Sequence, residues 1–191
     1  MIITPKQPRD GKTVSRLGTL VPYMLRGKGE ERCTWYMAGN LEGLDRREDA
    51  ELAIEVMEVL QKGNVRAKGS KTYHLVISFH PEDRRLAPAE LEDVVRRAVG
   101  AAGLAEHQYI AVRHSEQEHE HLHVAVNKIH PETLKIHHPY RAIPAFQALI
   151  GRAREEVRPS PGRSRRDANG DGPGARLRGS PEHREFLPLG A

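Results

Sequence analysis

Histidines are concentrated in one short part of the sequence. Eight of the eleven histidines fall between residues 107 and 138, where the densest stretch reads HEHLHVAVN. In a β-strand over residues 119–127, every second side chain shares one face, so His121 and His123 lie together. The aliphatic residues between them point to the other face, which suits a hydrophobic core. The pattern predicts imidazoles gathered on one surface of a strand.

A third imidazole can join this pair from the preceding strand. Residues 107–114 and 119–128 both read as strands, and the short polar tip between them favours an antiparallel hairpin. The hairpin brings His114 across from His121 or His123. Three neutral imidazoles can bind a divalent transition ion and leave coordination positions open for water or substrate oxygens. We therefore predict a metal site at these three histidines, with solvated surface histidines as the alternative.

Other polar residues of this segment receive supporting roles. Glu116, at the hairpin tip, can accept the second N–H of a ligand imidazole, or it is an exposed turn carboxylate. His119 and His130 are predicted to be bystanders or groups that contact the ligands.

A tyrosine near the start of the chain is a candidate nucleophile. Residues 14–26 carry apolar side chains at helical spacing and predict an amphipathic helix, which Pro22 should kink or end early. Tyr23 lies away from the apolar stripe, on a polar face that also includes Ser15. This position permits nucleophilic attack, although it also suits a partly buried surface tyrosine.

A central strand is predicted over residues 72–79, where apolar side chains alternate with others. His74 and Ser78 share one face of this strand. The Ser78 hydroxyl can contact a phosphate backbone, with ordinary hydrogen bonding at a strand edge as the alternative.

The remaining elements complete an α+β architecture. A further strand is expected at residues 33–39, and helices at 46–62, 88–101 and 141–156. We predict a largely antiparallel sheet of about five strands, sandwiched by helices.

The chain divides by composition near residue 157. Residues 1–157 are long enough to form one domain with a substantial core. Residues 158–191 contain six glycines, five prolines and seven arginines, with few aliphatic side chains. Such a segment cannot bury enough apolar surface to offset its ordering entropy, so we predict a disordered basic tail or linker.

The bulk composition indicates the compartment and a class of partner. The formal net charge of +4 is compatible with a polyanionic partner. The single cysteine, Cys33, cannot form an internal disulfide, and residues 1–12 lack the apolar stretch of a secretory signal. No apolar run approaches the roughly 18 residues of a membrane span. We therefore expect a cytoplasmic protein without membrane insertion.

Taken together, these segments resemble the relaxase domain of the TraI-type, P-class mobilisation proteins of conjugative plasmids, in the HUH endonuclease superfamily. The likeness covers about residues 13–157. Its first motif is VSRLGTLVPYMLRGKGEER, which places Tyr23 at the nucleophile position and Ser15 at a serine eight residues earlier. The second is KTYHLVISF, with Ser78 at the family serine.

The third motif of the resemblance is HSEQEHEHLHVAVNKIHPET. It places His121 and His123 at the family's His-x-His pair and His114 at the upstream histidine. Glu116 stands where the family usually has Asp. Two other departures are Pro22, directly before the nucleophile, and His119, an extra imidazole.

The resemblance implies a nickase that initiates transfer at an origin of transfer, in which Tyr23 becomes joined to DNA through a 5′-phosphotyrosyl bond. It implies a divalent metal ion, Mg²⁺ or Mn²⁺ with Zn²⁺ as an alternative. The implied partners are single-stranded DNA at a transfer origin, relaxosome accessory proteins and a coupling protein. Basic residues that can follow the phosphates are Lys12, Arg16, Arg26, Lys71 and Arg113, with a solvated surface as the alternative for each of them.

Three alternatives use the same residues differently. A rolling-circle replication initiator would share the chemistry, but its histidine motif normally precedes its tyrosine, whereas Tyr23 comes first here. In a metal-dependent phosphodiester hydrolase, water would attack and no covalent intermediate would form. In a DNA-binding accessory module, the histidines would hold a structural ion.

Overall fold

The computed structural model describes residues 1–6, 16–26, 33–115, 120–140 and 142–157. These ranges belong to one compact unit. The predicted tail at 158–191 lies outside the described residues, so its disorder remains a prediction.

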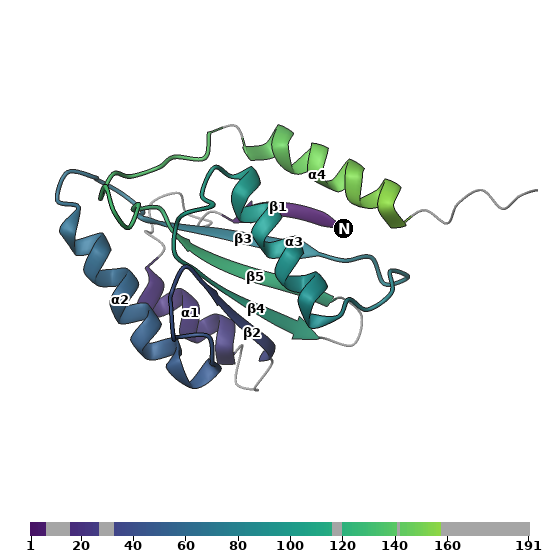
Figure 1. The fold of residues 1–191 in the computed structure, drawn as a ribbon, viewed down its shortest axis with the longest axis horizontal. Coiled ribbons are helices and arrows are strands. Elements are labelled where there is room, and N and C mark those ends of the chain that lie inside the picture. The colour runs from purple at the N-terminus through teal and green to yellow at the C-terminus, as the bar shows by residue number, and fades with distance from the viewer. Residues whose placement is uncertain (7–15, 27–32, 116–119, 141, 158–191) are drawn as a thin grey trace, which may run out of the picture. The chain divides into compact units, whose positions relative to one another are not determined.

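Strands of the described residues form one antiparallel sheet in the order β1-β3-β5-β4-β2 (Figure 1). They are β1 (Ile2–Lys6), β2 (Cys33–Gly39), β3 (Thr72–Ser78), β4 (Tyr109–Ser115) and β5 (Glu120–Asn127). Four of the five were predicted, with ends that differ by at most two residues. The exception is β1, a short edge strand whose sequence IITPK includes a proline, which pairs poorly inside a sheet.

Helices cover both faces of this sheet, as predicted. The described helices are α1 (Leu17–Arg26), the short 3₁₀ turn η1 (Arg47–Asp49), α2 (Ala50–Gly63), α3 (Pro88–Ala101) and α4 (Ala142–Val157). Residues of α1 and α2 share one core cluster with the sheet, and residues of α3 and α4 share another. The α+β sandwich expected from the sequence is therefore confirmed.

Helix α1 is held against the sheet by its apolar stripe. Leu17, Val21 and Met24 are fully buried, at the spacing that places them on one face of a helix. The Gly18 N–H donates a hydrogen bond of 3.1 Å to a carboxylate oxygen of Glu58, which fixes the start of α1 to α2.

Pro22 lies inside α1 without ending it. A kink or an early end was predicted at Pro22; the helix continues to Arg26, so the early end is wrong and the kink stays a prediction. Proline removes one backbone hydrogen bond, and the buried side chains at Val21 and Met24, on either side of it, keep the last turn packed on the sheet.

Truncation of Phe146 should detach α4 from the core. This side chain is 1% exposed and belongs to the cluster shared by α3 and the sheet. We expect Phe146→Ala to lower the free energy of unfolding by about 3–5 kcal/mol, measured by urea denaturation. Ile143 lies on the same helix and is 59% exposed, so Ile143→Ala serves as the control and should change stability little. Equal losses in the two variants would contradict this packing of α4.

Candidate metal centre and nuclease site

Side chains from three strands share the face of the sheet that α1 covers. The antiparallel register places His114 opposite His121, and His121 opposite Ser78. Residues directly opposite each other point to the same face, and His123 and His74 follow on that face by alternation. The buried side chains Val112 and Ala125, on this same face, pack in the cluster that contains α1.

The structure brings the three predicted metal ligands together. His114, His121 and His123 each offer a ring nitrogen, and these nitrogens all lie within 4.8 Å of one another. The distances between ring centroids run from 4.7 to 5.2 Å. His114 is buried, whereas the other two are partly accessible. This arrangement can hold a divalent ion and leave one side of it open.

In two of these imidazoles, those of His114 and His123, one ring nitrogen makes a hydrogen bond within the protein. His114 Nε2 lies 2.5 Å from the Met24 carbonyl oxygen, and since a carbonyl only accepts, Nε2 must be the donor. His123 Nδ1 lies 2.9 Å from His74 Nε2. Metal-binding histidines usually have the nitrogen that does not coordinate fixed in this way.

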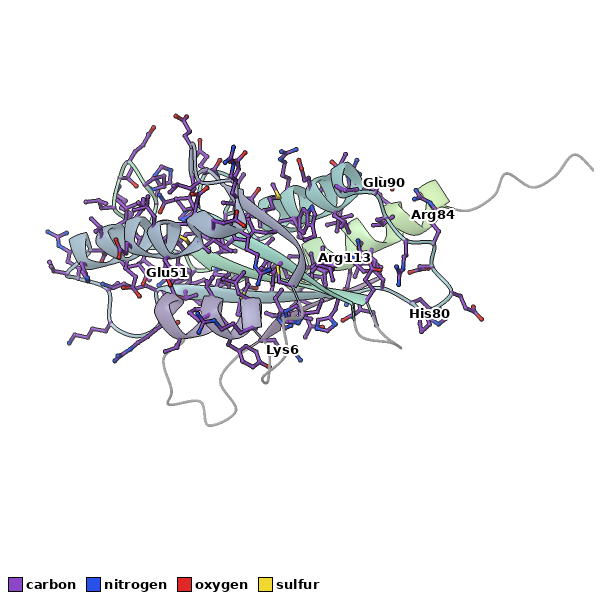
Figure 2. The ribbon with its side chains drawn as sticks, turned by 90° about the horizontal axis from the view of Figure 1, so that it is seen from below. Lys6, Glu51, His80, Arg84, Glu90 and Arg113 are labelled. Carbon is purple, nitrogen blue, oxygen red and sulfur yellow. The ribbon has the colours of Figure 1, made fainter. Side chains whose placement is uncertain are left out.

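Burial disfavours the charged form of two imidazoles on this face, those of His123 and His74. It lowers the pKa of His123 to about 3, with further contributions from the charges of neighbouring histidines and Lys6. Burial and then Lys6 lower the pKa of His74 to about 4. Neutral imidazoles are the form that binds a metal, so no proton has to be displaced from these rings. Lys6 pairs with His74 across β1 and β3, and Figure 2 shows it on the side of the sheet that α1 covers.

Tyr23 lies on α1, one residue before the carbonyl that binds His114. Its side chain is 49% exposed. The helix that carries this phenol therefore lies on the imidazole face and is hydrogen-bonded to the cluster. Ser78 faces His121 on the neighbouring strand. Ser15, Glu116 and His119 lie outside the described residues.

Two residues near the cluster received no role from the sequence. His74 was placed on the same face as Ser78, but its contact with His123 depends on the pairing of β3 with β5. Lys6 lies on β1, which was not predicted as a strand. The alternation along residues 72–79 could have indicated that His74 lies on the imidazole face. No pattern in the sequence indicated a position for Lys6.

A second group of histidines lies near the start of β4. His107 Nδ1 is 2.8 Å from the Asn127 carbonyl, and His137 Nε2 is 3.1 Å from the Ala102 carbonyl. His130 Nε2 is 3.2 Å from a carboxylate oxygen of Glu106. These hydrogen bonds connect loops to the sheet, which gives this group a structural role.

Some of the basic residues expected to contact DNA have internal partners. The guanidinium of Arg113 pairs with Glu120 at 3.1 Å, and Arg113 pairs with Leu122 on the face opposite the imidazoles. The Lys71 ammonium donates to the carbonyls of Gln61 and Asn64. Contact of Arg113 and Lys71 with DNA therefore stays a prediction, and it would compete with these internal partners. Arg16 directly precedes α1 and Arg26 is its last residue, whereas Lys12 lies outside the described residues.

The fold is an antiparallel α+β sandwich. On one face of its sheet, three imidazoles lie beside the helix that carries Tyr23. This arrangement is typical of a candidate metal centre that a substrate can reach from one side. The sequence assigns it further: residues 23–156 match the relaxase family described as MobA/VirD2-like, nuclease domain. The match covers more than half of the chain, which therefore belongs to this family. The relaxase resemblance read from the three motifs is confirmed.

Curated relatives agree with this assignment. A protein named TraI from Escherichia coli is 41% identical over 95 residues, which is 50% of this chain and 13% of the relative. A protein named MobA from Acidithiobacillus ferrooxidans is 35% identical over 80 residues, 42% of this chain and 19% of the relative. The chain thus matches only a small part of the length of these relatives. Within the described ranges, no helix is long and apolar enough to cross a membrane.

The asparagine of the third motif anchors the sheet to α2. Asn127 is fully buried. Its amide donates to the Met57 carbonyl at 3.2 Å and to the Gln108 side chain at 3.3 Å. Its oxygen accepts from the Ile129 N–H at 3.0 Å. A buried amide with all these partners has a structural role.

Asn127→Ala should therefore destabilise the domain. Loss of the amide leaves buried donors and acceptors without partners, and we expect the free energy of unfolding to fall by about 1–3 kcal/mol. Gln147→Ala removes an exposed amide from α4 and is the matched control. Chemical denaturation of both variants tests the role, and wild-type stability in Asn127→Ala would exclude it.

Proposed function

We propose that this domain is a site- and strand-specific DNA nickase that initiates conjugative transfer or mobilisation at an origin of transfer. Tyr23 attacks the scissile phosphodiester and becomes joined to the DNA. The proposal is carried by the hydrogen bond from His114 to the Met24 carbonyl, which connects a three-imidazole cluster to the helix of Tyr23. Membership of the relaxase family supports the same activity.

The residues present fit a divalent ion. Three imidazoles, His114, His121 and His123, offer nitrogens at mutually compatible distances. Since Nε2 of His114 serves the Met24 carbonyl, coordination by His114 would use Nδ1. A set of nitrogen ligands favours a transition ion over Mg²⁺, which prefers oxygen ligands. When bound, such an ion supplies polarisation of the phosphate oxygens and stabilises the charge of the transition state.

Tyr23 is the proposed nucleophile of the covalent step. The phenolic oxygen of Tyr23 forms a bond to phosphorus while the bond from phosphorus to the 3′ oxygen breaks. The leaving oxygen takes a proton and becomes a free 3′-hydroxyl, and the phenolic proton passes to water or to a neutral imidazole of the site. One phosphodiester replaces another, so the step needs no ATP and can be reversed to rejoin strands.

The substrate is single-stranded or locally unpaired DNA. The imidazoles share a face with α1 and are buried or partly buried, and we infer that a stacked duplex would not present its backbone to them. Ser78 lies opposite His121, and its hydroxyl would donate to a phosphate oxygen. Ser15, at the serine of the first motif, is proposed as a further residue of the site, and Glu116 as the group that accepts the second N–H of a ligand imidazole. Accessory proteins and a coupling protein are proposed as partners in the full transfer machinery.

Replacement of Tyr23 tests the covalent step. The protein is incubated with Mn²⁺ and 3′-labelled single strands that tile the DNA flanking its gene, and adducts that resist SDS are resolved on gels. We expect an adduct in the wild type and a loss of about three orders of magnitude or more in Tyr23→Phe, because the nucleophile is gone. Tyr140→Phe, at a tyrosine that is 87% exposed, is the matched control and should form adduct normally.

Two outcomes of that experiment contradict the proposal. Adduct that persists in Tyr23→Phe would exclude Tyr23 as the nucleophile. Cleavage by the wild type without any adduct would instead identify a hydrolase in which water attacks.

Thermal stability in the presence of metal tests the ion site independently of cleavage. An ion that binds only the folded state stabilises it by about 2.7 kcal/mol at one hundred times its dissociation constant, so Mn²⁺ should raise the melting temperature. We expect His121→Ala to abolish most of this shift. His138→Ala removes an imidazole outside the cluster and should preserve it. An unchanged shift in His121→Ala would show that the ion binds elsewhere.

A further inference from the structure

A fourth imidazole contacts the cluster without belonging to it. His74, on β3, places Nε2 at 2.9 Å from Nδ1 of His123, and the two rings stack with centroids 5.2 Å apart and an interplanar angle of 28°. The contact is diagonal across the strand pair, because His74 lies opposite Ala125 and His123 lies opposite Val76.

The distance between the two nitrogens identifies a hydrogen bond. Two nitrogens that share an ion at 2.0–2.1 Å with tetrahedral geometry lie about 3.4 Å apart. The observed 2.9 Å is shorter than this and is the usual length of a hydrogen bond from nitrogen. His74 is therefore a hydrogen-bonding partner of His123 at this nitrogen.

Whether His123 can bind an ion depends on which of the two histidines donates the proton of this hydrogen bond. If His74 donated, the proton of His123 would reside on Nε2, and neither nitrogen of His123 would have a lone pair for a metal. If His123 donates from Nδ1, its Nε2 carries a lone pair that can coordinate.

We propose that His74 is a positioning residue, which accepts the Nδ1–H of His123 and so holds His123 in the tautomer that presents Nε2 to the ion. The inference rests on the metal site of the proposed function. It gives the strand that carries Ser78 a second role, because β3 then orients a ligand on β5.

Histidine tautomers in the full chain can be read directly by NMR. In ¹⁵N-labelled protein, long-range correlations between ring protons and nitrogens should show His123 protonated at Nδ1, both without metal and with diamagnetic Zn²⁺. A proton on Nε2 without metal, or coordination of Zn²⁺ through Nδ1, would overturn the proposal. This measurement uses the wild type, so it does not depend on whether a variant folds.

Metal affinity provides the second test. Mn²⁺ binding, measured by electron paramagnetic resonance, should weaken about 10- to 100-fold in His74→Phe, which keeps a ring but has no acceptor. His74→Gln retains an acceptor oxygen and should recover most of the affinity. His107→Phe makes the same change at a buried histidine outside the cluster, and should leave Mn²⁺ affinity unchanged even if its melting temperature falls.

The outcomes separate this inference from the proposed function. If His121→Ala binds Mn²⁺ like the wild type, the three-imidazole site itself is wrong. If His121→Ala loses binding while folded His74→Phe retains full affinity, only the role of His74 is wrong. If His74→Phe does not fold, the tautomer of His123 in the wild type and the Mn²⁺ affinity of His74→Gln test the role of His74. Weak Mn²⁺ binding by a folded His74→Gln would contradict that role, because this variant retains an acceptor.

Discussion

The hydrogen bond between His114 Nε2 and the Met24 carbonyl joins the two halves of the proposed site. One end belongs to the imidazole cluster and the other to the last turn of α1. A carbonyl near the end of a helix lacks an intrahelical partner, so it is free to accept from a side chain. The buried stripe of α1 brings this carbonyl to the sheet, and the hydrogen bond orients the His114 ring. The position of Tyr23 relative to the cluster depends on both.

Strand register is the second constraint. His114, His121 and His123 converge only because β4 and β5 pair with His114 opposite His121. A slip of one residue would move His121 and His123 to the other face of the sheet. The register is held by the apolar cores on both faces, where Leu122 packs on one side and Ala125 on the other. The packing that stabilises the fold therefore also assembles the site.

Alternation and helical spacing in the sequence were sufficient to predict four strands, the helices and the group of three histidines. Strand β1 was missed because five residues that include Pro5 give too short a pattern, and its pairing with β3 is a long-range interaction. The contact of His74 with His123 was missed for the same reason, since it requires the relative register of two strands. Arg113 shows the opposite case: it precedes His114 in one strand, so alternation alone places it on the other face.

The charge of the proposed centre follows from its ligands. A neutral imidazole ligand does not offset the charge of a divalent ion, whereas a carboxylate ligand would. The full charge of the ion then acts on whatever enters the open side. Lys6, on the same face, adds a further positive charge. An anionic phosphodiester is the ligand that such a field attracts, and a water molecule gains much less from it. The ligand set thus favours a nucleic-acid backbone as substrate, in agreement with the relaxase family to which the chain belongs.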